Sequence, residues 1–152
     1  MGLILVFLLL SATVIIWFSS KSGPESSVQS EGVTLHLART FYRDFDDLPE
    51  IEQRRIIYEW NPYVRKAAHV IEFAVLSVGV TILFVHLGSF KRYVLWAFLT
   101  GAVIAAGDEL FQLSVSGRDA SIRDVGIDCI GVALGVMIGA LITHIGRKRR
   151  YE

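Results

Sequence analysis

Ionisable and amide side chains interrupt three apolar stretches of this sequence, where hydrocarbon does not tolerate them unpaired. A charged side chain at the centre of a membrane helix costs about 2.5 to 3.5 kcal/mol, so such residues usually face the protein interior or a polar cavity. Carboxylates placed together could bind a divalent cation, and a carboxylate beside a histidine could transfer protons as a general acid or base. The residues concerned are His69, Glu72, Asp108, Glu109, Gln112, Asp124 and Asp128.

The spacing of these residues groups them by helix face and by depth. His69 and Glu72 are three residues apart, so they share one face of a helix. Asp124 and Asp128 are four apart and also share a face. At a rise of roughly 1.5 Å per residue, the groups lie within about 10 Å of one end of each stretch. In an up-and-down arrangement those ends meet on the same side of the membrane, so we predict one polar pocket there.

Four apolar stretches are long enough to carry these groups into a membrane. Of the 152 residues, 53% are hydrophobic and 20% are charged, and a spanning helix needs roughly 20 apolar residues. We predict an all-α fold, a four-helix transmembrane bundle that forms a single domain over residues 1–152. The predicted spans are residues 2–18, 67–87, 93–113 and 125–145.

Composition excludes several other classes of protein. Lys and Arg number 15 and Asp and Glu also number 15, so no basic face is expected for nucleic-acid binding. Hydrophobic and aromatic residues are too abundant for a disordered chain. Cys129 is the only cysteine, which excludes an intramolecular disulfide and a multi-cysteine zinc site.

A polar segment, residues 19–66, joins the first two spans and is too charged to enter hydrocarbon. Residues 19–27 are typical of a turn. The weak periodicity that follows fits either short amphipathic helices on the bilayer or a plain solvated loop. Asn61-Pro62 is expected to stop a helix just before the second span.

The distribution of Lys and Arg indicates the orientation. Cations crowd the C-terminal tail and the turn between the second and third spans, which lie on the same side and are typical of cytoplasmic segments. We therefore predict a multi-pass membrane protein with both termini in the cytoplasm, and with the polar segment and the turn 114–123 facing outward. The cations are Lys91, Arg92, Arg147, Lys148, Arg149 and Arg150.

This orientation places the predicted pocket in the outer leaflet, where two interpretations of it stay open. The groups could form a buried network of hydrogen bonds and ion pairs that ties three helices together, or a pocket that binds a ligand or ion. Crowded carboxylates favour an external divalent cation, with Glu72, Asp108, Asp124 and Asp128 as candidate ligands. The predicted pocket residues are Arg65, Lys66, His69, Glu72, Asp108, Glu109, Gln112, Arg118, Ser121, Arg123, Asp124 and Asp128.

Small residues recur every four positions along the fourth span, at Gly131, Gly135 and Gly139. This pattern is typical of close helix packing, and it suits contact within one bundle or between two copies of the chain in a homo-oligomer. Gly117, just before Arg118, is expected to be a turn residue.

Taken in order, these motifs resemble those of the VanZ-like family, small bacterial membrane proteins named after an accessory teicoplanin-resistance protein. A serine-rich segment after the first span and the R-K-x-x-H-x-x-E motif from Arg65 resemble two of its elements. The D-E-x-x-Q motif from Asp108 and the G-R-x-x-S-x-x-D-x-x-x-D-x-x-G-x-x-x-G motif from Gly117 resemble two more. Phe73 stands where a tyrosine is common in the family, and the turn before Gly117 lacks a proline often present there.

The resemblance implies an envelope protein of the bacterial cytoplasmic membrane that gives low-level resistance to teicoplanin-type glycopeptides without catalysis. Such drugs act on lipid-linked wall precursors at the outer leaflet, where the predicted pocket lies. Arg65, Arg118 and Arg123 could hold a phosphate. The expected partners are therefore the lipid bilayer and a lipid-linked cell-wall precursor or lipid headgroup.

The alternative is an intramembrane enzyme that acts on a polyprenyl-phosphate or another lipid headgroup. Glu72, Asp108 or Asp124 would then be the general base and His69 an acid or base, with a divalent cation polarising the phosphoryl group. No recognised nucleophile motif accompanies these residues, so no catalytic residue is assigned. Ion transport is disfavoured, because the polar residues gather at one side of the membrane only.

Overall fold

The computed structural model describes residues 1–88, 90–119 and 121–148, and over this part of the chain the fold is helical without strands. Four of its helices are long and apolar enough to cross a membrane, which confirms the predicted all-α fold with four membrane-spanning helices. The helices are α1 (Gly2–Ser19), α2 (Gly23–Phe41), α3 (Glu50–Leu87), α4 (Phe90–Gln112) and α5 (Ile122–Lys148), with a short 3-10 helix η1 (Phe45–Asp47) between α2 and α3.

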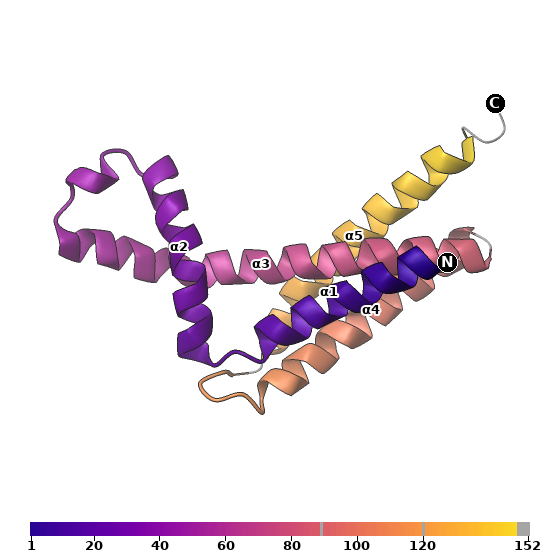
Figure 1. The fold of residues 1–152 in the computed structure, drawn as a ribbon, viewed down its shortest axis with the longest axis horizontal. Coiled ribbons are helices and arrows are strands. Elements are labelled where there is room, and N and C mark those ends of the chain that lie inside the picture. The colour runs from indigo at the N-terminus through magenta and orange to yellow at the C-terminus, as the bar shows by residue number, and fades with distance from the viewer. Residues whose placement is uncertain (89, 120, 149–152) are drawn as a thin grey trace.

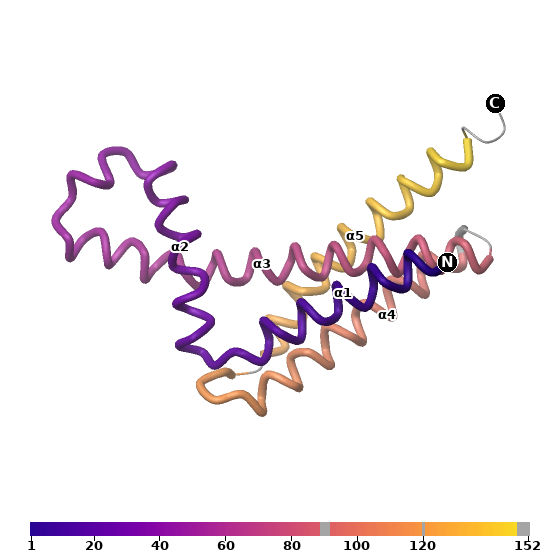
Figure 2. Tube along the Cα trace, viewed as in Figure 1, coloured from indigo at the N-terminus to yellow at the C-terminus, as the bar shows by residue number. Residues whose placement is uncertain are grey.

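The four long apolar helices run up and down, as Figures 1 and 2 show. The two described chain ends lie toward the same end of the bundle as the end of α3 and the start of α4. The end of α1, the end of α4 and the start of α5 lie toward the opposite end. Helix α3 is central, because it packs against α1, α2, α4 and α5. The end of α4 and the start of α5, which carry ionisable residues, therefore meet on one side of the bundle, next to the middle part of α3 that carries His69.

A narrow apolar core holds these helices together and leaves most of their apolar surface outside. Phe73 and Leu76 of α3 pack with Ile15 of α1 and with Val132 and Val136 of α5. Large apolar side chains on the outer faces are exposed, such as Leu3 at 88% and Val103 at 72%. A water-soluble monomer rarely exposes apolar surface on this scale, whereas a bilayer would cover it.

The glycines of α5 allow its backbone to approach α3 closely. A Cβ atom on Gly131 would clash with the carbonyl group of Val70, and one on Gly135 would clash with the carbonyl group of Ala74. On Gly139 the added atom would lie 2.8 Å from the Cβ of Thr81. The structure thus places the stripe of small residues between two helices of one chain.

The polar segment is mainly helical rather than a solvated loop. The turn expected over residues 19–27 is confined to residues 20–22, because α2 begins at Gly23. The expected helix stop before the second span is wrong. Pro62 does not stop a helix, because α3 runs unbroken through it. Pro62 is exposed, so the carbonyl group that loses its helical hydrogen bond there faces outward. Asn61 holds this turn against α2, donating to the Ser27 carbonyl oxygen at 2.9 Å and accepting from the Thr34 hydroxyl at 3.0 Å.

The 38 residues of α3 extend about 57 Å at 1.5 Å per residue, well beyond a hydrocarbon core of about 30 Å. Its first turns therefore project from the bundle and pair with α2 (Figure 1). Ala38, Phe45 and Ile56 form a second small apolar core there. The projecting hairpin thus has packing of its own, and it sets α2 beside the part of α3 that carries the ionisable residues.

The cap of α2 should make the stability of this hairpin sensitive to acid. Glu25 accepts hydrogen bonds from the Ser22 hydroxyl at 2.8 Å and the Ser22 backbone N–H at 2.9 Å, which lower the pKa of Glu25 below its ordinary 4.5. The charged carboxylate is therefore favoured in the folded state. Its contribution is present above the ordinary pKa and is lost as the pH falls through the lowered one.

Glu25→Gln should accordingly lower the melting temperature at neutral pH and flatten its dependence on acid. Circular dichroism in detergent micelles, from neutral to acidic pH, measures both effects. Glu31→Gln is the matched control, since Glu31 is an exposed residue of the same helix outside the cap. An acid transition in Glu25→Gln as steep as that of the wild type would contradict the role of the cap.

Candidate functional site

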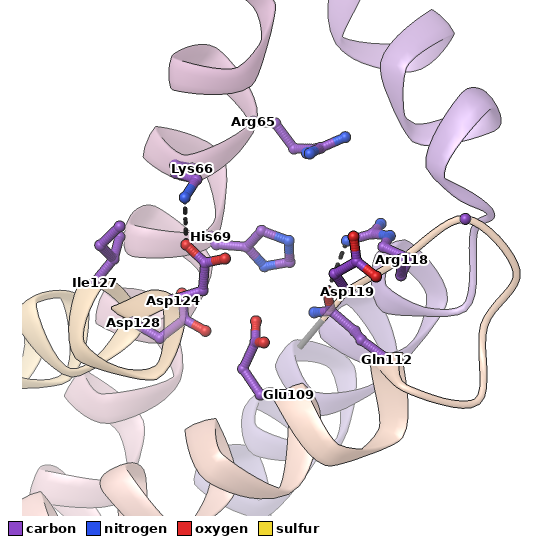
Figure 3. A pocket seen from close by; sticks show the side chains of 11 residues that line it. Arg65, Lys66, His69, Glu109, Gln112, Arg118, Asp119, Asp124, Ile127 and Asp128 are labelled. Carbon is purple, nitrogen blue, oxygen red and sulfur yellow. Dashed lines mark hydrogen bonds and ion pairs between the residues drawn. The ribbon is translucent and has the colours of Figure 1, made fainter. Parts of the chain in front are cut away.

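A polar cavity of about 270 Å³ opens where α3, α4, α5 and the connection between α4 and α5 meet (Figure 3). Its lining comes from the last turn of α4 and the first two turns of α5, as the depth argument predicts. The lining residues of α3 lie in the interior of that helix, because α3 begins at Glu50, well before the predicted span. The lining residues are Arg65, Lys66, His69, Glu109, Gln112, Gly117, Arg118, Asp119, Asp124, Ile127 and Asp128.

Four of the residues predicted for the pocket lie outside this lining. Glu72 lines a neighbouring groove, and Asp108 is buried against α1. Ser121 precedes α5 and donates its backbone N–H to Glu109 Oε2 at 3.1 Å. Arg123 is exposed, with its backbone N–H bonded to the Ser121 hydroxyl at 3.1 Å.

Sequence reasoning missed three lining residues, namely Gly117, Asp119 and Ile127. Gly117 was correctly expected at a turn, because its φ of 71° lies in the left-handed region that favours glycine. This turn brings the residues that follow it back over the cavity. Asp119 could have been found from its place beside Arg118, whereas Ile127 gives no polar signal.

Asp108 is the centre of a buried hydrogen-bond network. Its Oδ2 accepts from the Ser19 hydroxyl at 2.8 Å and from the Gln112 side-chain amide at 2.8 Å. The Gln112 amide oxygen in turn accepts from Arg118 Nη1 at 2.9 Å. These bonds join α1, α4 and the segment that follows α4. This part of the site is therefore a buried network that ties helices together, one of the two interpretations that the sequence left open.

Arg118 also caps the C-terminal end of α1. Its Nε donates to the Lys21 carbonyl oxygen at 3.1 Å and its Nη2 to the Phe18 carbonyl oxygen at 3.2 Å. A cation at the C-terminal end of a helix interacts favourably with the last carbonyl groups and the helix dipole. All three guanidinium nitrogens of Arg118 thus have protein partners. Burial, and then the positive charge of Arg65, lower the pKa of Arg118.

Lys66 and Asp124 form an ion pair between α3 and α5 at another wall of the cavity (Figure 3). The two side chains are 35% and 28% exposed. Each neutralises the other, so neither offers an unpaired charge to a ligand.

His69 and Glu72 form a buried polar pair on α3 with two unsatisfied hydrogen-bonding atoms. His69 Nδ1 lies 3.5 Å from Glu72 Oε2, and the two side chains are only 13% and 14% exposed. Neither of these buried atoms has a hydrogen-bond partner among the residues that the structure describes. Buried polar atoms are normally paired, so both are available to water or to a bound molecule.

Arg65 differs from the other two cations of the cavity. Within the described part of the chain it forms no hydrogen bond or ion pair, although it is half-buried. Figure 3 shows its guanidinium group over the cavity, on the side of α3. Arg65 is therefore a positive charge at the edge of the site without a counter-ion among the described residues.

An apolar groove of about 580 Å³ adjoins the polar cavity between α2, α3 and the end of α1. Its apolar walls come mainly from Val33 and Leu37 of α2 and from Val64, Ala68 and Ile71 of α3. The residues common to the groove and the cavity are Arg65, His69 and Arg118.

The predicted divalent-cation site stays a prediction. Over the described residues, no three or more His, Cys, Asp and Glu side chains are gathered closely enough to hold one metal ion. Of the candidate ligands, Asp108 and Asp124 already have protein partners, and Glu72 and Asp128 line different spaces.

One known protein family matches nearly the whole of this sequence. The family model described as VanZ/LLP1 matches residues 4–143, a range that contains the cavity, the groove, the second and third spans and most of the first and fourth. Comparisons with curated proteins and with solved structures gave no match. Because the match covers most of the sequence and includes every motif described above, the chain belongs to the VanZ/LLP1 family.

Proposed function

We propose that the chain binds the phosphate-bearing headgroup of a lipid-linked envelope component in the polar cavity, and that this binding lowers susceptibility to teicoplanin-type glycopeptides. The observation that carries the proposal is Arg65, a half-buried cation at the cavity with no counter-ion among the described residues. A guanidinium group binds phosphate through charge-assisted, often bidentate hydrogen bonds. Burying such a group without a partner is costly, and a phosphate would remove the cost.

The rest of the cavity favours a headgroup that has more than a phosphate. Glu109 and Asp128, on α4 and α5, line the side of the cavity opposite Arg65. Their carboxyl oxygens accept hydrogen bonds, which the hydroxyl and amide donors of a sugar or peptide supply. A phosphate joined to a sugar or peptide matches both sides of the cavity.

The proposed orientation places this cavity in the outer half of the bacterial cytoplasmic membrane. Arg92, Arg147 and Lys148 lie at the end of the bundle opposite the cavity, and cations are enriched on the cytoplasmic side. Arg149 and Arg150 lie outside the described residues, as does the side chain of Lys91. Both termini are then cytoplasmic, and the cavity faces the leaflet in which lipid-linked wall precursors are exposed.

A second candidate function is hydrolysis or transfer at a lipid phosphate, and the observation in its favour is the His69–Glu72 pair at 3.5 Å. An imidazole beside a carboxyl group suits general acid–base catalysis. The other carboxylates named for that role, Asp108 and Asp124, are already bonded within the protein. Binding therefore stands as the first proposal.

Susceptibility to teicoplanin and vancomycin, measured in a sensitive Gram-positive host that expresses the chain, tests the proposed function. The wild-type chain should raise the inhibitory concentration of teicoplanin, and Arg65→Gln should abolish the effect because it removes the phosphate-binding charge. Arg55→Gln is the matched control. Arg55 is on the same helix, pairs with Glu59 at 3.0 Å and is 69% exposed.

The amounts of the three proteins in the membrane must be equal for this comparison. Protection by Arg65→Gln equal to that of the wild type would exclude the cavity as the functional site. No change with the wild-type chain would exclude the resistance function.

A further inference from the structure

The apolar groove and the polar cavity share a wall, and this arrangement matches a molecule with two chemically different parts. Arg65 and His69 face both spaces. On one side of them the lining is polar and charged, and on the other it is formed mainly by aliphatic side chains of α2 and α3. The change from polar to apolar surface thus occurs within one turn of α3.

We propose that the groove holds the hydrocarbon chain of a single-chain isoprenoid or acyl phosphate whose phosphate group binds Arg65 in the cavity. This inference rests on the proposed function, because it assumes that the cavity binds the headgroup. It adds that the protein recognises the hydrocarbon chain of the lipid as well as its headgroup, and that α2 takes part in this recognition. Helix α2 becomes one wall of a lipid-binding site.

Charge complementarity selects this occupant over a protein helix or a second copy of the chain. Arg65 lines both the groove and the cavity and has no counter-ion in the described structure, so the occupant has a negative charge at one end. The groove wall contains Ala67, Ala68 and Ile71, which belong to the apolar part of α3 that can cross the membrane. The occupant is therefore hydrocarbon for the rest of its length.

The size of the groove agrees with one flexible chain. Its volume of about 580 Å³ lies within the range of about 300 to 1,000 Å³ that is usual for small-molecule sites. Ala67 and Ala68 are exposed small residues on the α3 side, and they leave room that a larger side chain would fill. A Trp side chain in place of Ala68 would occupy the groove without touching the cavity.

Binding of farnesyl phosphate to the full chain in phosphatidylcholine nanodiscs tests the inference. Val33→Trp fills the groove from α2 and Ala68→Trp fills it from α3. Each should weaken binding about tenfold or more, since displacing even two methylene groups from an apolar site costs that much. Arg65→Gln should also weaken it about tenfold, through the lost charge-assisted bonds. Farnesol and inorganic phosphate should each bind much more weakly than farnesyl phosphate.

Val103→Trp is the matched control, because Val103 is exposed on α4, away from the groove. Its affinity should equal that of the wild type. Normal binding by both groove variants, with weaker binding by Arg65→Gln, would overturn the proposal that the groove holds the hydrocarbon chain and would leave the proposed headgroup site intact. Inorganic phosphate binding as tightly as farnesyl phosphate would also overturn it. Farnesyl phosphate binding that Arg65→Gln does not weaken would overturn both proposals.

Discussion

Asp108→Ala should lower the free energy of unfolding by about 3 kcal/mol, since two buried donors lose their acceptor and each loss costs about 1 to 3 kcal/mol. The donors are the Ser19 hydroxyl and the Gln112 amide, both 2.8 Å from Asp108 Oδ2. Ser19 and Gln112 are themselves buried, so bulk water cannot replace the carboxylate. The end of α1 should separate from α4 in this variant.

Thermal unfolding in detergent micelles, followed by a thiol-reactive fluorogenic dye, measures the effect. Cys129 is the only cysteine in the sequence and is partly buried on α5, so it reacts faster as the bundle opens. Asp119→Ala is the control, because Asp119 also lines the cavity but is exposed. Asp108→Asn should fall between the two, since its neutral amide oxygen can still accept both bonds but more weakly than a carboxylate. Equal melting of Asp108→Ala and Asp119→Ala would show that the network does not stabilise the fold.

This network shows how far the sequence could predict the site. The periodicity of the spans was sufficient to bring His69, Asp108 and Asp128 to one end of the bundle, because apolar length and helix rise fix depth. It could not decide which carboxylates are paired. Pairing depends on side-chain reach across helices, as in the contact from Ser19 to Asp108, and one sequence contains no signal for that choice.

The polar segment was harder to predict, for a local and a long-range reason. The local signal was present, because Ser22 followed three residues later by Glu25 is a capping-box pattern and marks the start of α2. Pro24, within the first turn of α2, hid it by also being typical of a turn. The long-range result, the groove between α2 and α3, depends on how two helices pack, and weak amphipathic periodicity does not specify that geometry.

The sequence also left open whether the glycine stripe of α5 packs within one chain or between two copies, and a single substitution separates the two. Gly135→Leu should lower the free energy of unfolding by about 1 to 3 kcal/mol or more, as overpacking a tight interface does. The Cβ atom alone would clash with the backbone carbonyl group of Ala74, and a carbonyl group within a helix cannot turn aside. Helix α5 must therefore move away from α3.

Gly126→Leu is the control on the same helix, because nothing lies within 4 Å of a Cβ atom added there. Its melting temperature, measured with the same Cys129 assay, should match that of the wild type. Gly135→Leu should melt at a lower temperature, with its oligomeric state in size-exclusion chromatography unchanged. A smaller particle with unaltered melting would instead assign the stripe to a contact between copies. Because Asp128 and Gly135 lie on one continuous helix, a shift of α5 would also move a wall of the cavity, so the same variant should bind farnesyl phosphate more weakly.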